Sequence, residues 1–163
     1  MSVAFRRDGD EEHLEPKFEI PIPPGPNLVT ARGLAQINER VAELEARVAE
    51  LVAAGAEQSQ VDVAKRDLRY WQTRQITAEP VPVPRGDTVE IGTRVTFCLN
   101  GRDRSLSITG DDEADPAAGR IAFSAPIARA MLGAEEGELR PFGGNDEAIE
   151  ILEIAVVPAD GSA

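Results

Sequence analysis

The carboxylates that could do chemistry in this sequence gather in one short run, Asp111, Asp112, Glu113 and Asp115. Four acidic side chains so close together could bind calcium. The run, however, lacks the central glycine and the glutamate at position twelve that an EF-hand loop requires. Glycines flank it at Gly110 and Gly119, and acidic side chains commonly fix turns by bonding to the backbone. We therefore predict a structural turn between two strands, and no metal site.

Other residue types that support catalysis are scarce. The chain has one histidine, His13, which lies in the N-terminal segment without partners, and one cysteine, Cys98, in the strand-like stretch VTFCLN. A single cysteine cannot form an internal disulfide. There is no P-loop, no nucleophile elbow and no zinc-ligand spacing. We expect that the chain is not an enzyme by itself and that it binds no cofactor tightly.

The charge balance argues against a protein that binds nucleic acid on its own. Seventeen basic and 29 acidic residues give a net charge of −12. Residues 30–78 carry seven of each sign, whereas residues 79–163 carry sixteen acids and seven bases. The electrostatic attraction that dominates nucleic-acid binding would be repulsive overall. No apolar run or signal sequence points to a membrane, and we expect a cytoplasmic protein.

The elements that must position these residues begin with a coiled coil. Residues 1–29 form a proline-rich leader, for which we expect an extended, flexible conformation. Apolar residues then recur at alternating spacings of three and four, at Leu34, Ile37, Val41, Leu44, Val48 and Leu51. Val61, Ala64, Leu68, Trp71, Gln75 and Ala78 continue this spacing after a break at residues 55–60, with one polar lapse at Gln75. We predict an antiparallel helical hairpin over 30–79, with Thr30 as its N-cap and a stop at Gly55, and a semi-rigid linker at 80–86. A parallel dimer through the first helix is the alternative.

The second half of the chain reads as a β domain over 87–158, followed by a tail at 159–163. The alternation of Ile121 and Phe123 predicts a short strand there. Ser124 is placed to cap a short helix that begins at Pro126 and stops at Gly133. The fold class predicted for the chain is α+β.

The order of the motifs in this half resembles the C-terminal domain of the GreA/GreB transcription elongation factors. The residues that carry the resemblance are EAD at 113–115, G-x-I at 119–121 and the segment SAPIARAMLG at 124–133. Gly92, Thr93, Val95 and Phe97 match the family's first strand of that domain. The resemblance implies an N-terminal coiled coil followed by an FKBP-like domain with one main helix.

The resemblance also implies a partner and a mechanism. Factors of this family dock on RNA polymerase through the C-terminal domain and insert the hairpin into the secondary channel. Acidic residues at the hairpin tip then help to hold a Mg²⁺ ion, shared with the polymerase, that drives cleavage of backtracked nascent RNA. Nascent RNA would be met only within that complex. The residues expected at the docking surface are Asp112, Glu113, Asp115, Ser124, Pro126, Ile127 and Arg129.

The hairpin tip departs from the family pattern. The family motif G-D-L-S-E-N-A-E-Y is replaced here by GAEQSQVDV at 55–63, which leaves Glu57 and Asp62 as the nearby carboxylates. These two could assist a metal, or they could be solvated residues of a helix–helix turn, which the residue pattern favours. Each arm is also shorter than in the family, as in Rnk-type members. Two functions stay open: a channel-binding elongation factor, with or without stimulation of cleavage, and an adaptor for a partner other than the polymerase.

One further feature of the hairpin is a group of basic residues on its second helix: Lys65, Arg66, Arg69 and Arg74. Such a stripe could contact RNA or an acidic surface of the polymerase. A basic helix face is more often simply solvated, so both interpretations stand.

Overall fold

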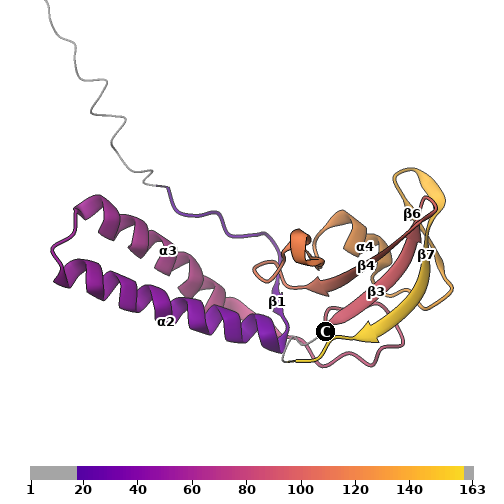
Figure 1. Ribbon diagram of the computed structural model, residues 1–163, viewed down its shortest axis with the longest axis horizontal. Helices are drawn as coiled ribbons and strands as arrows, with labels where there is room; N and C mark the ends of the chain where they lie inside the picture. Colours follow the sequence, from indigo (N-terminus) through magenta and orange to yellow (C-terminus); the bar gives the residue numbers. More distant parts are fainter. Residues whose placement is uncertain (1–17, 160–163) are drawn as a thin grey trace, which may run out of the picture. The chain divides into compact units, whose positions relative to one another are not determined.

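The computed structural model describes residues 18–159 and confirms the α+β fold class (Figure 1). The described chain divides into two compact units. One holds most of the helical hairpin, Asn38–Ile76, with residues 18–24. The other holds Gly25–Ile37 and everything from Thr77 onward, so the start of the first helix belongs with the β domain. None of the helices in the described range is long and apolar enough to span a bilayer.

The hairpin consists of helix α2 (Ala31–Ala53) and helix α3 (Gln58–Thr77), which run antiparallel in Figure 1. Thr30 caps α2 as predicted, because its Oγ1 accepts a hydrogen bond of 3.0 Å from the Gly33 N–H. Gly55 ends the arm with φ +67°, a left-handed conformation that glycine adopts without steric cost. The four-residue connection from 54 to 57 makes the two helices neighbours in space.

The predicted apolar seam is confirmed on both helices. Ile37, Val41, Leu44 and Leu51 are buried on α2. Leu51 packs with Val61 and Ala64 of α3, and Val48 and Ala56 complete that small cluster near the tip. The side chain missed by the apolar pattern is Arg74, which is only 1% exposed and is the largest fully buried side chain of the described residues. The expectation of an open basic stripe is therefore wrong at Arg74.

The leader and the linker contain a structural element that the sequence did not suggest. Strand β1 (Asn27–Val29) pairs in parallel with strand β2 (Ala78–Pro80), in the register Asn27 to Ala78. Residues 27–29 are thus a strand of the C-terminal unit rather than the end of a flexible leader. The Val81 N–H also donates to the Val29 carbonyl at 2.9 Å, which extends the pairing beyond the strands. This small sheet ties the two ends of the hairpin to the same unit.

The main sheet of the C-terminal unit has five strands in the order β5-β4-β3-β7-β6. Its strands are β3 (Thr93–Leu99), β4 (Arg102–Thr109), β5 (Arg120–Ala122), β6 (Leu139–Phe142) and β7 (Asn145–Val156). The pairs are antiparallel except for β4 with β5, which are parallel. A register shift between Thr96 and Phe97 leaves Leu152 of β7 out of the pairing, which explains its exposure.

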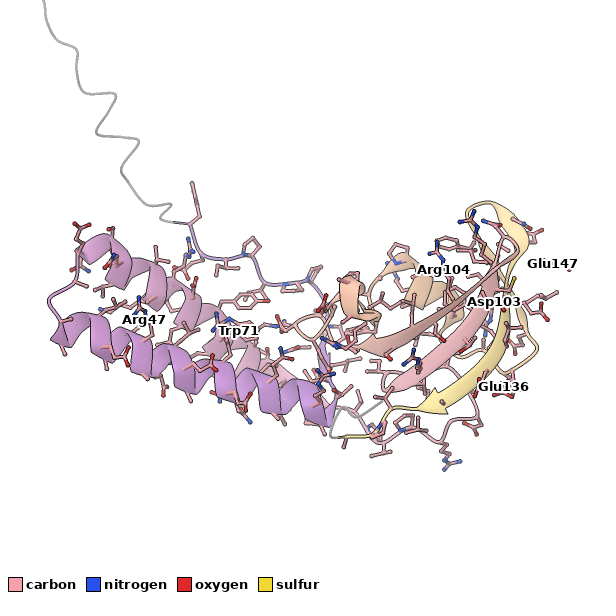
Figure 2. All side chains as sticks on the ribbon, viewed as in Figure 1. Arg47, Trp71, Asp103, Arg104, Glu136 and Glu147 are labelled. Carbon is pink, nitrogen blue, oxygen red and sulfur yellow. The ribbon has the colours of Figure 1, made fainter. Side chains whose placement is uncertain are left out.

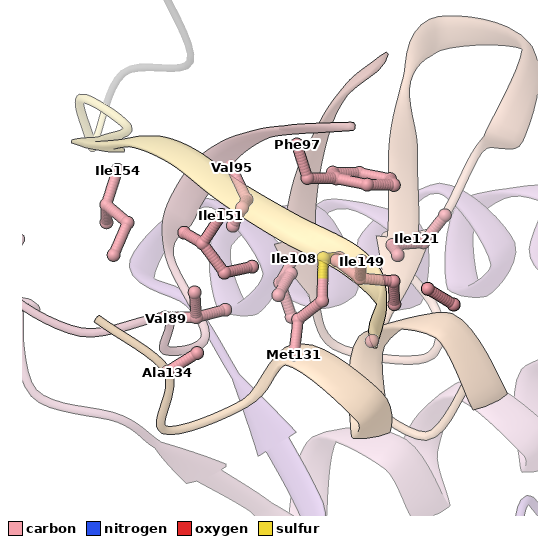
Figure 3. Close-up of a cluster of buried hydrophobic side chains, with 12 residues drawn as sticks. Val89, Val95, Phe97, Ile108, Ile121, Met131, Ala134, Ile149, Ile151 and Ile154 are labelled. Atoms are coloured by element: carbon pink, nitrogen blue, oxygen red, sulfur yellow. The ribbon is translucent and has the colours of Figure 1, made fainter. Parts of the chain in front are cut away.

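One face of this sheet carries the core of the unit (Figure 3). Phe97, Ile108, Ile149 and Ile151 are completely buried there. Met131 reaches into the cluster from helix α4 (Pro126–Met131), the short helix that covers this face. Alternate residues of the strands point to the opposite face, which is largely polar.

The start of α4 differs from expectation. The residue at its N-cap position is Ala125, which makes no side-chain cap. Ser124 instead donates from its hydroxyl to Asp111 Oδ1 at 2.6 Å. Pro126 lies in the first turn as predicted, and Gly133 follows the helix with φ +85°.

Candidate functional site

The hairpin tip brings few carboxylates together. Glu57 lies just before α3 and its carbonyl accepts hydrogen bonds from the Gln60 and Val61 amides, at 3.0 and 3.2 Å. Asp62 lies one turn into α3, where Gln58 Nε2 donates to its Oδ1 at 2.8 Å. Both acidic residues are exposed. Across residues 18–159, no group of three histidine, cysteine or acidic side chains is arranged to hold a metal ion.

The remaining basic residues of α3 have different surroundings. Lys65 is exposed, and Arg66 pairs with the adjacent Asp67 at 3.2 Å. Arg69 forms a bidentate pair with Glu19, in which Nη2 lies 2.7 Å from Oε1 and Nε lies 3.0 Å from Oε2. The hydrogen bond to Arg69 and the positive charge of that guanidinium lower the pKa of Glu19, while the hydrogen bond to Glu19 and its negative charge raise the pKa of Arg69. Through this pair, the segment at 18–24 is attached to the basic face of α3, which was expected to be free to contact RNA or the polymerase.

The acidic turn of the C-terminal unit is a network of internal hydrogen bonds. Between β4 and β5 the chain makes a turn and a short 3-10 helix, η1 (Pro116–Ala118), as the flanking glycines indicate. Arg120 donates from Nε to the Glu113 carbonyl at 3.2 Å, and its Nη2 lies 3.6 Å from Asp115 Oδ2. With the Ser124–Asp111 bond, these contacts support the predicted structural role of the acids.

Glu113 makes the contact that reasoning from the sequence missed. Its side chain is 6% exposed, and its Oε2 accepts a hydrogen bond of 2.7 Å from the Thr30 hydroxyl. Gly33 makes room for this carboxylate, because a Cβ added there would lie 2.8 Å from the same oxygen. The first turn of α2 has no acidic residue of its own. Glu113 therefore supplies, from 83 positions away, the negative charge that the N-terminus of a helix favours.

A second close approach holds the same region. A Cβ on Gly110 would lie 2.5 Å from the Leu28 carbonyl oxygen, so the acidic turn begins against the backbone of β1. The only sequence signal for these two close approaches is the glycine itself, Gly33 or Gly110, within an otherwise regular pattern.

The expected docking residues divide into exposed and structural positions. Asp115, Ser124, Pro126 and Arg129 are exposed, and Asp112 is half-buried. Ile127 packs partly against the core, and the Glu113 carboxylate is hydrogen-bonded to Thr30. The available surface is thus the outer side of the acidic turn and the start of α4.

Comparison with known proteins identifies the family. Residues 84–156 match the family model described as transcription elongation factor, GreA/GreB, C-term. Transcription elongation factor GreA of Pseudomonas putida is 33% identical over 141 residues, which cover 85% of this chain and 82% of that protein. The chain belongs to the GreA/GreB family. The GreA of Pseudomonas aeruginosa is 34% identical over 107 residues, covering 63% of this GreA/GreB chain and 67% of that one.

Among solved structures, the GreA factor homolog 1 (Gfh1) protein of Thermus thermophilus superposes with a TM-score of 0.37 at 16% identity. The superposition covers 80% of this chain and 99% of that one. The family assignment depends on the sequence relatives and not on this weak superposition.

Proposed function

We propose that this GreA/GreB family member binds RNA polymerase through its C-terminal unit and occupies the secondary channel without stimulating transcript cleavage. The hairpin would enter the channel and exclude other channel-binding factors. Nascent RNA would be met only inside that complex. Membership of the family supports RNA polymerase as the partner. The residues at the hairpin tip support a mechanism without cleavage stimulation.

The carboxylates near the tip do not suit a shared Mg²⁺ site. Glu57 lies before the first residue of α3, whereas Asp62 lies one turn into that helix. Asp62 is further engaged by the Gln58 amide. Ala56 stands where the family motif has aspartate. A labile metal in a phosphoryl-transfer centre needs oxygen ligands that converge on one point, and within residues 18–159 no group of three acidic, histidine or cysteine side chains is placed to hold a metal ion.

Docking is supported by the surface that stays accessible in the C-terminal unit. Asp115, Pro126 and Arg129 present one acidic, one apolar and one basic group on neighbouring segments. None of the three belongs to the buried core. Substituting them should weaken binding to the polymerase without unfolding the unit.

Cleavage of nascent RNA in stalled, backtracked elongation complexes tests this proposal. We expect the same cleavage rate with and without the wild-type protein, and the same rate with the Glu57→Ala, Asp62→Ala double variant. Stimulation by the wild type that is lost in the double variant would overturn the proposal and establish a cleavage factor with a relocated acidic tip.

Binding is measured in parallel, by co-sedimentation of the protein with core polymerase. Near-stoichiometric binding that Arg129→Ala weakens supports the docking surface. Absence of binding would overturn the proposal and favour an adaptor that acts on another protein.

A further inference from the structure

Two arginines flank a serine in one row across the polar face of the main sheet. Arg94 of β3 is paired with Ser107 of β4, and Ser107 is paired with Arg120 of β5. Residues paired in this way lie on the same face of a sheet. Neighbouring strands are about 4.8 Å apart, so the two arginines start roughly 10 Å from each other with the serine between them. This spacing suits two guanidinium groups that converge on one small ligand.

A pocket of about 170 Å³ lies over this row. All of its lining residues belong to the C-terminal unit. Thr30, the N-cap of α2, and Arg32, in its first turn, are polar residues of the lining. The apolar part of the lining includes Val81, Pro82, Val83, Pro84, Ile91 and Val157.

The charges around this pocket are unbalanced. Three arginines line it, Arg32, Arg94 and Arg120, but only one acidic residue, Glu113. The Glu113 carboxylate already accepts the Thr30 hydroxyl, and Arg120 is held by the Glu113 carbonyl and Asp115. Within residues 18–159, the guanidinium groups of Arg32 and Arg94 form no ion pair and no side-chain hydrogen bond. Such a positive concentration is unexpected in a chain of net charge −12.

We propose that this pocket binds a small organic anion, with its phosphate or carboxylate head held by Arg32, Arg94 and Arg120 and a short apolar body against the apolar part of the lining. Arginine donates paired N–H groups in a planar fork that matches the oxygens of such heads. The Ser107 hydroxyl lies between two of the arginines and can donate to the same head. The volume admits only a small ligand.

Isothermal titration calorimetry on the full chain tests the site, with phenyl phosphate, benzoate and inorganic phosphate as probes at low ionic strength. Phenyl phosphate and benzoate distinguish the two head groups, and inorganic phosphate reports the head without an apolar body. We expect binding of at least one aromatic probe, tighter than that of inorganic phosphate. Failure of all three probes to bind would overturn the proposal.

Variants localise the binding. Arg94→Gln and Arg32→Gln should each weaken the Kd at least tenfold, because each removes a charged donor from the head group. Arg104→Gln is the matched control, since Arg104 is exposed on β4 and does not line the pocket (Figure 2). Equal weakening by Arg104→Gln would show nonspecific attraction and overturn the site.

Amide chemical-shift mapping provides a readout that does not depend on any variant. Shifts should concentrate at Gly92, Ser107 and the first turn of α2. Probe-induced shifts centred elsewhere would contradict the assignment even if the calorimetry shows binding. Arg32→Gln serves as the test variant if Arg94→Gln lowers the melting temperature.

Discussion

At the scale of single residues, Glu113 joins two segments that are distant in the sequence. The carboxylate accepts the hydroxyl of the residue that caps α2, and it occupies the space that a side chain at Gly33 would need. Hydrogen bonds to charged groups contribute about 1.5–3 kcal/mol, and this one is shielded from water. Glu113 therefore acts as a structural residue of the unit, although its place in the EAD motif predicted a surface role.

Replacing Glu113 with alanine should lower the free energy of unfolding by about 2 kcal/mol, because the Thr30 hydroxyl loses its acceptor and the helix start loses a negative charge. Urea denaturation of Glu113→Ala, Thr30→Val and the double variant measures the coupling, which we expect at about 1 kcal/mol. Asp115→Ala is the control and should change stability by less than about 0.5 kcal/mol, since its side chain is half exposed. Additive effects of the two single variants would refute the contact.

Gly33 gives a prediction whose sign depends on Glu113. Gly33 is the third residue of α2, and alanine is a better helix former than glycine. In the wild-type chain, Gly33→Ala should bring no gain, since the new Cβ would displace the Glu113 carboxylate from Thr30. In the Glu113→Ala background the same change should stabilise the protein. Denaturation of the four variants checks this, and equal stabilisation in both backgrounds would contradict the geometry.

At the scale of secondary-structure elements, the periodic parts of the fold were predictable and the short irregular parts were not. The seam from Leu34 to Leu51 repeats often enough to define a helix face, and the structure buries it. Strands β1 and β2 have three residues each, in proline-rich sequence that is typical of an extended linker. Strand β4 begins with the polar run Arg102–Ser105, which lacks an alternating apolar pattern.

The candidate site was predictable to a smaller extent, for related reasons. The turn at Gly110–Gly119 follows from its glycines and acids, because turn chemistry is local. The burial of Arg74 and Glu113 depends on tertiary packing, and charged residue types normally indicate the surface. The prediction that Ser124 caps α4 was wrong, because its hydroxyl donates to Asp111, thirteen positions away in the sequence.

The segment at 18–24 makes a contact with α3 whose pH dependence has a definite sign. The Arg69 hydrogen bond lowers the pKa of Glu19, so the contact is present above the ordinary glutamate pKa of about 4.3 and is lost as the pH falls through the lower folded value. An NMR titration of the Glu19 side-chain carbon should give a midpoint below 4.3. In Arg69→Gln the midpoint should return to the ordinary value. Identical midpoints in both proteins would refute the contact.

At the scale of the whole molecule, two features of this GreA/GreB family member point in different directions. The C-terminal unit keeps the family's motifs over residues 84–156. The hairpin arms, with 23 residues in α2 and 20 in α3, end in a tip with two exposed carboxylates, of which Asp62 accepts a hydrogen bond from Gln58. Under the proposed function, such a factor would compete with cleavage factors for the secondary channel of the polymerase.

The most direct test is therefore a competition on backtracked elongation complexes. GreA is added at a fixed concentration, this protein is titrated, and the initial rate of transcript cleavage is measured. Competition predicts a rate that falls toward the unstimulated level as this protein saturates the polymerase, with weaker inhibition by Arg129→Ala. A cleavage rate that stays constant or rises under saturating conditions would contradict the central claim.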